Sequence, residues 1–283
     1  MIHHFTVDVE EYFHATPLEA WLPRDRWDGL ERRSPRLVAR LLELLDRRGV
    51  KGTFFVLGWL AEREPDVVRA IAAAGHEIAS HGWAHRVVHG MQPKDFRTTV
   101  RRSKELLEEL SGRPVVGYRA PSFSILPGTE WALGILEEEG YEYDSSLFPT
   151  SVHPSYGYPD APRVPHVLDQ ARGTNGTLVE VPPSTCRLAG LELPGAGGAY
   201  FRILPYALTR RTLRQAEARG APGTFYIHPW EVDEHPPSLP APWRVRARLQ
   251  TGTGRTGARL ERLLRDFEFG PMGDTVAGLR LAV

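Results

Sequence analysis

The sequence of 283 residues contains a single cysteine, Cys186. An internal disulfide is therefore excluded, and a lone thiol gives no indication of redox chemistry. Neither sign of charge is in excess, because 35 lysine and arginine residues balance 35 aspartate and glutamate residues at neutral pH. This balance gives no sign of the positive charge excess that binds nucleic acid or an anionic membrane. We do not expect nucleic acid as a partner.

Long apolar runs are also missing. No stretch approaches the roughly 18 consecutive apolar residues that a transmembrane helix needs. The opening residues, MIHHFTVDVEEYF, lack the basic region and following apolar stretch of a secretory signal. The sequence therefore predicts a protein of the cytoplasm, without a transmembrane segment.

Short runs of β-branched and aromatic residues alternate with longer segments of helical periodicity, which is typical of a parallel sheet or barrel. Glycine follows the last periodic residue of each helical segment, where a helix commonly ends. The strands are expected at 2–9, 52–57, 76–80, 115–119, 141–145, 178–182 and 224–228. The helices are expected at 34–49, 59–74, 91–112 and 128–140.

This βα rhythm ends near residue 145. Segments 149–175 and 183–205 are rich in Pro, Gly, Tyr and His, and we expect long loops of functional importance there. Residues 238–257 are expected to form a surface connection to a last short helix at 258–269. We interpret 1–283 as one domain, in which 231–283 extends a catalytic barrel formed by 1–230.

The first expected strand ends in an acidic stretch, VDVEEYFH. Alternation along a strand places Asp8 and Glu10 on one face and Glu11 on the opposite face. In parallel α/β folds the catalytic groups come from the carboxyl ends of the strands. The sequence therefore predicts that Asp8 and Glu10 point together into a site, unless they are solvated acids at the end of a strand.

The third expected strand is followed by HGWAH, so His81 and His85 lie four residues apart. Two imidazoles and one carboxylate, with the remaining positions open to water, are typical of a catalytic zinc-type site. The glutamate of the zinc-protease motif H-E-x-x-H is absent, which disfavours that class. Exposed or core histidines without a metal are the alternative interpretation.

Two more polar residues follow later strands. Arg119, in YRAPSF, can hold a neighbouring carboxylate ionised and oriented, although an ordinary ion pair would look the same. His228, in FYIHPWE, can donate a proton to a leaving amine near neutral pH, although a core histidine is equally compatible with the sequence.

Taken together, TVDVE, HGWAH, RAPS and FYIHP resemble the motifs of the polysaccharide deacetylases of carbohydrate esterase family 4, the NodB-homology group. The resemblance runs over residues 1–230. It implies a deformed (β/α)7 barrel that holds a divalent metal, most often Zn²⁺, and hydrolyses the acetamido group of a sugar in a polysaccharide. By the same resemblance, Asp8 is the general base, His81 and His85 are metal ligands, Arg119 orients the base, and His228 is the general acid.

The sequence departs from the family pattern at three positions. Val9 stands where the family usually has a metal-binding aspartate. Relatives that begin with D-x-(D/E) use the second acid, and the alternation of the strand independently selects Glu10 over Glu11. Gly82 replaces a Ser or Thr, and Ser122 replaces an aromatic residue.

A closer resemblance is to the deacetylases associated with exosortase and exopolysaccharide gene clusters, on the segments DVEEYFH, GYRAPSFSI, YDSSLFP, GGAYFRILP and HPWE. It implies a role in exopolysaccharide biosynthesis, peripheral contact with membrane-bound glycan machinery, and a C-terminal region such as 231–283. It also makes Asp144 a partner for Arg119.

Aromatic and rigid residues near these motifs are candidates for contact with sugar rings, with core packing as the alternative. We select Trp83, Pro121, Tyr200 and Trp230. The glycines of 194–205 would let the backbone approach a ligand. His14 has no assigned role.

Three rival functions remain open from the sequence. The first is hydrolysis of a non-sugar C–N bond, as in an allantoinase or a formamidase, on the same barrel. The second is an inactive sugar-binding scaffold. The third is an iron oxygenase, which the βα rhythm disfavours. The glycan, the native metal and the oligomeric state are left open.

Overall fold

Parallel β-strands form the centre of the protein in the computed structural model, which describes residues 1–153 and 155–281. One sheet has the order β10-β1-β2-β3-β4-β5-β7-β6, with β11 also paired to β1, and β8 and β9 form a separate hairpin. The strands are β1 (Ile2–Val9), β2 (Thr53–Val56), β3 (Glu77–Ser80), β4 (Gly117–Tyr118), β5 (Tyr143–Asp144), β6 (His166–Val167), β7 (Val179–Glu180), β8 (Thr185–Leu188), β9 (Leu191–Pro194), β10 (Thr224–Ile227) and β11 (Glu268–Gly270).

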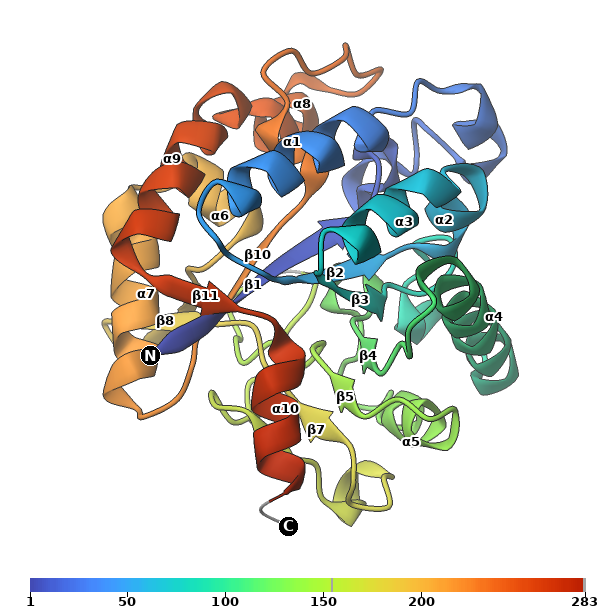
Figure 1. The fold of residues 1–283 in the computed structure, drawn as a ribbon, viewed down its shortest axis with the longest axis vertical. Coiled ribbons are helices and arrows are strands. Elements are labelled where there is room, and N and C mark those ends of the chain that lie inside the picture. Colours follow the sequence, from blue (N-terminus) through green and yellow to red (C-terminus); the bar gives the residue numbers. More distant parts are fainter. Residues whose placement is uncertain (154, 282–283) are drawn as a thin grey trace.

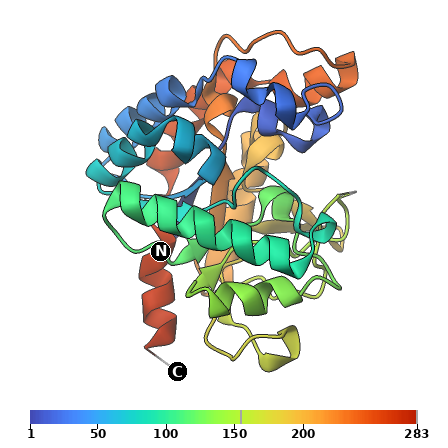
Figure 2. The same cartoon turned by 90° about the vertical axis from the view of Figure 1, so that its right-hand side faces the viewer.

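Helices surround this sheet (Figure 1). They are α1 (Ser34–Asp46), α2 (Gly58–Arg63), α3 (Pro65–Ala73), α4 (Pro93–Ser111), α5 (Trp131–Glu138), α6 (Gly198–Ile203), α7 (Tyr206–Ala218), α8 (Trp243–Gln250), α9 (Thr253–Asp266) and α10 (Met272–Arg280). Figure 2 shows α4 lying across the molecule and α10 at the end where the C-terminus lies. None of the helices in the described part of the chain is both long and apolar enough to cross a membrane.

The predicted fold class is confirmed: the seven expected strands are present, and they form a curled, parallel half-barrel. The antiparallel strand β6 adds to its edge. The helix expected at 59–74 is divided into α2 and α3, because Pro65 has no N–H to donate and Glu64 before it leaves the helical conformation, at φ −130° and ψ 60°.

The second half of the chain has more regular structure than expected. The loop expected at 183–205 contains the hairpin β8–β9 and α6, and the connection expected at 238–257 contains α8. The helix expected at 258–269 is α9, which starts at Thr253. It is not the last element, because β11 and α10 follow it. The elements β8, β9, α6, α8 and β11 are short, so their own sequences carry little periodicity.

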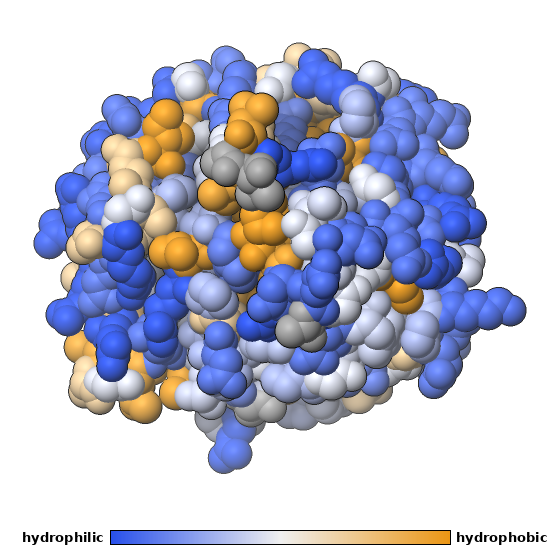
Figure 3. Space-filling model, turned by 90° about the horizontal axis from the view of Figure 1, so that it is seen from below, coloured by the Kyte–Doolittle hydropathy of each residue, from blue (hydrophilic) through white to orange (hydrophobic). Residues whose placement is uncertain are grey.

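Strand β1 is the second strand of the sheet, next to the edge strand β10. It pairs in parallel with β10, β2 and β11, and seven of its eight residues are buried. Parallel pairing places the carboxyl ends of β1, β2, β3, β4 and β10 at one edge, where Asp8 and Glu10 emerge. The face seen in Figure 3 is mostly hydrophilic, with apolar residues in separate patches.

The aromatic core beneath β1 should dominate stability. The ring of Phe5 is fully buried and lies 5.5 Å from that of Phe225 and 5.8 Å from that of Phe269. We expect Phe5→Ala to lower the free energy of unfolding by about 3–5 kcal/mol, because the truncation leaves a cavity. Ile2→Ala, in the same strand but 61% exposed, is the control and should change it by less than about 1 kcal/mol. Urea denaturation of both variants measures the difference, and equal losses would contradict this account.

Candidate active site

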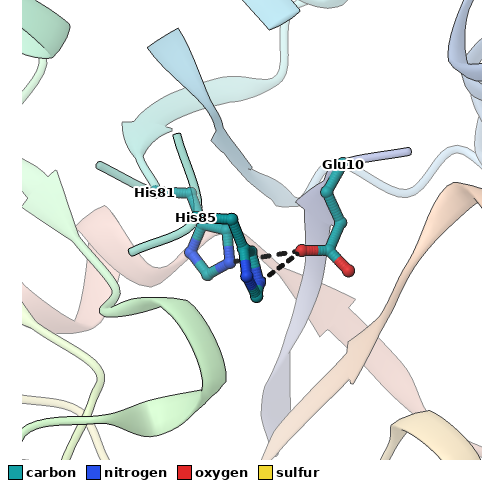
Figure 4. A group of neighbouring side chains, drawn as sticks. All are labelled: Glu10, His81 and His85. Atoms are coloured by element: carbon teal, nitrogen blue, oxygen red, sulfur yellow. Dashed lines mark ion pairs between the residues drawn. The ribbon is translucent and has the colours of Figure 1, made fainter. Parts of the chain in front are cut away.

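Three side chains at the sheet edge point toward one another (Figure 4). Glu10 follows β1, and His81 and His85 follow β3. One ligand atom from each lies within 4.8 Å of the other two, and all three residues are buried. The Glu10 Oε2 atom lies 2.7 Å from His85 Nε2 and 3.9 Å from His81 Nε2. This group could hold a metal ion.

The imidazole of His81 is held in the form that a metal ligand requires. Its Nδ1–H donates to the backbone carbonyl of Arg119 at 2.8 Å, which leaves the lone pair on Nε2 toward Glu10. Burial lowers the pKa of His81 to about 4, so the ring is neutral at pH 7. Gly82, which departs from the family pattern, has φ 73°, a left-handed conformation that favours glycine.

Glu11 has a different position from Glu10. Its carboxylate accepts the backbone N–H groups of Arg33 and Ser34, both at 2.9 Å, where α1 begins. It therefore binds the helix rather than the histidines. The alternation of β1 is enough to explain this separation, because consecutive side chains leave the strand on opposite faces.

Arg119 is the fully buried cation beside the cluster. Its Nη1 donates to Asp8 Oδ1 at 2.7 Å and to Thr6 Oγ1 at 2.8 Å, while its Nε and Nη2 donate to the carbonyl and hydroxyl of Ser145. The guanidinium also lies 4.1 Å from the ring of Phe55. With its donors used in this way, Arg119 fixes the orientation of Asp8.

The expected pairing of Asp144 with Arg119 is not found among the described residues. Asp144 instead accepts the hydroxyl of Ser146 at 2.6 Å, and Ser146 in turn accepts the backbone N–H of Ala120 at 2.8 Å. Burial raises the pKa of Asp144 to about 6. The side chain that contacts Arg119 is the next one along, Ser145, because alternation sends Asp144 to the other face of the short strand β5.

His228 stands on the other side of the acidic pair. Its Nε2 lies 3.7 Å from Glu10 Oε1 and 3.9 Å from Asp8 Oδ2, and its Nδ1 contacts Glu231 Oε2 at 2.9 Å. Burial acts against the charged ring, but the carboxylates of Glu10 and Glu231 raise the pKa of His228 to about 9. The imidazole is therefore held protonated at neutral pH.

Glu231 and Arg202 form a buried pair behind His228, and neither residue was selected from the sequence. Arg202 Nε donates to Glu231 Oε1 at 2.5 Å, and both side chains are 0% exposed. Arg202 also donates to the backbone carbonyls of Thr251 and Arg248. The i,i+3 spacing in HPWE is the one signal that pointed to Glu231, whereas nothing in the sequence connects Arg202 to it.

A cavity of about 770 Å³ opens above these groups. Of the predicted sugar contacts, Tyr200 and Trp230 line it, and Trp230 Nε1 donates to Glu10 Oε1 at 3.3 Å. Trp83 and Pro121 are not among the lining residues. Trp83 lies under the guanidinium of Arg102, 3.5 Å from the ring centroid, because the turn after His81 directs it toward α4.

The glycines of 194–205 allow this segment to pack closely against a neighbouring strand. Gly197 and Gly198 have φ 153° and 53°, and an added Cβ would lie 2.3 Å from the carbonyl oxygen of Tyr226 at the first and 2.9 Å from its ring at the second. They allow this segment to approach β10, and Gly198, Ala199 and Tyr200 then line the cavity. This segment therefore lines the cavity, but the close approach that its glycines allow is to Tyr226 rather than to a ligand.

His14 packs behind the cluster. It is buried against Trp27 and Trp59, its ring stacks 6.4 Å from that of His85, and its Nδ1 accepts the backbone N–H of Glu11. Burial lowers the pKa of His14 well below its usual value. It is a neutral packing residue that supports His85.

Two family models match the chain. The model of polysaccharide deacetylases matches residues 27–143, and a domain of unknown function, DUF3473, matches residues 145–277. The boundary between the two falls directly after β5.

Curated relatives carry related names. The chain is 33% identical over 160 residues to a peptidoglycan deacetylase-like protein of Gibberella zeae, which is 56% of this chain and 45% of the relative. It is 33% identical over 94 residues to a peptidoglycan-N-acetylglucosamine deacetylase of Bacillus cereus, which is 33% of this chain and 34% of the relative. The chain thus spans less than half the length of these relatives.

Solved structures of other proteins have the same fold as this chain. A polysaccharide deacetylase structure from Mycobacterium smegmatis has a TM-score of 0.66 at 24% identity and covers 99% of this chain and 91% of that one. Another from Pseudomonas aeruginosa has a TM-score of 0.61 at 21% identity and covers 97% of this chain and 89% of that one. These likenesses show that the chain has the same fold as these two structures.

Proposed function

We propose that the protein is a metal-dependent hydrolase that removes N-acetyl groups from amino sugars of a polysaccharide or of its oligosaccharide precursor, in exopolysaccharide biosynthesis. The observation that carries the proposal is the arrangement of one cavity, which brings Asp8, His228 and the group of Glu10, His81 and His85 together. The names of the curated relatives, which act on peptidoglycan and chitin, support an acetamido sugar as the substrate.

The donor set fits a divalent metal. Glu10 Oε2 is buried and accepts no hydrogen bond from any group that the structure describes, and two Nε2 atoms face it. Two imidazoles with one carboxylate suit zinc, and we propose Zn²⁺ held by Glu10, His81 and His85. When bound, such an ion supplies Lewis-acid chemistry, which polarises a carbonyl and makes water more acidic.

Two residues of the protein would each carry out one of the two proton transfers. Asp8, ionised and oriented by Arg119, takes a proton from the water that attacks the acetyl carbon. The C–N bond breaks as His228, held by Glu231, gives its proton to the departing amine. Acetate and the free amino sugar result. The base and the acid are thus separate groups, and both line the cavity beside Glu10.

The base assignment is tested with Asp8→Asn. We expect kcat on N-acetylglucosamine oligomers to fall by about 10²–10⁴-fold, because the amide cannot accept the proton. Metal content, measured by mass spectrometry, should stay at the wild-type level. Release of acetate and of primary amine is the readout for a panel that also contains allantoin and formamide. Full turnover by the variant would refute the base, and hydrolysis of the non-sugar compounds alone would refute the substrate class.

The metal site is tested by comparing two adjacent glutamates. Glu10→Gln should weaken Zn²⁺ binding by about 100-fold or more, since even a residue that only orients a ligand contributes about 10- to 100-fold. Glu11→Gln is the matched control, because Glu11 faces α1, and it should bind Zn²⁺ as the wild type does. Competition with a chromogenic chelator measures both. The reverse order of the two effects would contradict the site.

The acid assignment predicts a change in pH dependence. His228 must be protonated to act, and its raised pKa of about 9 places the loss of activity on the alkaline side. Glu231→Gln removes one carboxylate that raises this pKa, so the alkaline limb of kcat/KM should move about one unit to lower pH. The acidic limb should stay in place, and a shift of that limb alone would contradict the assignment.

A further inference from the structure

The wall of the cavity formed by the second half of the chain carries a charge that the proposed deacetylation does not use. Arg248, near the end of α8, lines the cavity together with His153, Tyr156 and Tyr200. We propose that Arg248 binds an oxyanion on the glycan, a carboxylate or a phosphate, so that the enzyme acts on acidic rather than neutral acetamido glycans. This inference rests on the proposed function and specifies its substrate.

Arg248 differs from the other charged side chains of the lining. Asp8 pairs with Arg119, Glu10 with the histidines, and Arg202 with Glu231. Arg248, in contrast, forms no ion pair with any acidic side chain in the described part of the chain. Among the described residues, its guanidinium hydrogen-bonds to the ring of His153, 3.2 Å from Nε2. A cation that faces a ligand cavity without a counter-charge is suited to an anionic group of the ligand.

His153 does not neutralise this charge. Burial, together with the positive charge of Arg248, lowers the pKa of His153 to about 4, so its ring is neutral at pH 7. The Nδ1 atom accepts the backbone N–H of Ser155 at 3.2 Å. The Nε2 atom faces the guanidinium of Arg248, which can only donate, so the donor available to an oxyanion here is the guanidinium.

Neighbouring residues hold the backbone of Arg248 in place. Arg202 donates to the backbone carbonyl of Arg248 at 3.0 Å while its Nε binds Glu231, so α8 is tied to the group that holds His228. The ring of His153 stacks on Tyr156 with centroids 3.6 Å apart. The backbone of Arg248 and the ring of His153 are therefore held in place beside the cavity, while the guanidinium of Arg248 is exposed.

The sequence around Arg248 is also positively charged. Residues 235–260 contain five arginines and no aspartate or glutamate, although the whole chain is neutral. Arg244, Arg246 and Arg255 are exposed on this segment. Their positive field would attract an acidic glycan toward the cavity and should weaken as salt rises.

The experiment compares two pairs of substrates of the full-length, Zn²⁺-loaded enzyme. The first pair is a neutral chitin tetrasaccharide and a hyaluronan tetrasaccharide, which carries carboxylates. The second pair is neutral N-acetylglucosamine and N-acetylglucosamine 1-phosphate. Wild type should show a lower KM for at least one acidic substrate than for its neutral counterpart. The preferred acid identifies the anion as carboxylate or phosphate. Equal KM values for acidic and neutral substrates would overturn the proposal.

Variants separate binding from folding. Arg248→Gln should raise KM for the preferred acidic substrate by about 10-fold with kcat within twofold, and should leave the neutral substrate unchanged. Arg248→Lys, which keeps the charge, should recover most of the affinity. Arg244→Gln is the control, because Arg244 is exposed on the same helix but does not line the cavity. Equal effects of Arg248→Gln on acidic and neutral substrates would contradict the proposal.

A binding measurement keeps this inference separate from the proposed function. Calorimetry with the Asp8→Asn protein measures affinity for the hyaluronan tetrasaccharide and the sugar phosphate without turnover. Binding that depends on Arg248 would support the anion site even if no acetamido sugar is hydrolysed, and such a result would refute only the deacetylase function. Deacetylation without any preference for an acid would refute only the anion site.

Discussion

The buried pairing of Arg119 with Asp8 is the contact on which the rest of the site depends. A guanidinium that is removed from water is stable only when its charge and its donors are satisfied, and Asp8 and Thr6 of β1 do this together with Ser145 at the end of β5. The backbone carbonyl of the same residue binds His81. One residue therefore connects the proposed base, the proposed metal ligands and the segment after β5, so their relative positions are fixed together.

The cavity is shared by both matched regions of the chain. His81, His85 and Arg119 come from the region that matches polysaccharide deacetylases, while Tyr200, His228 and the end of α8 come from the DUF3473 region. Asp8 and Glu10 precede both. The Arg202–Glu231 pair joins the proposed acid to the backbone at the end of α8. In this protein, the second region thus forms part of the cavity wall.

The sequence predicted those parts of the structure that follow from local rules. Alternation in β1 separated Glu10 from Glu11, and glycine and proline signals placed the early helices. The sequence did not predict the contacts between residues that lie far apart in the chain. Trp83 was assigned to the ligand although a turn directs it to α4, and Asp144 was assigned to Arg119 although its neighbour Ser145 makes the contact. Arg202, Glu231 and β11 act through contacts with residues tens to hundreds of positions away, which no local pattern contains.

The pairing of β1 with β10 and β11 has a consequence for how the protein reaches its native state. Strand β1 leaves the ribosome more than 200 residues before β10 and β11, so it lacks these two neighbours during that interval. Contacts of such separation slow folding, and an unpaired apolar strand is prone to aggregate. Production of the protein should therefore respond strongly to temperature and to chaperones that cover extended apolar segments.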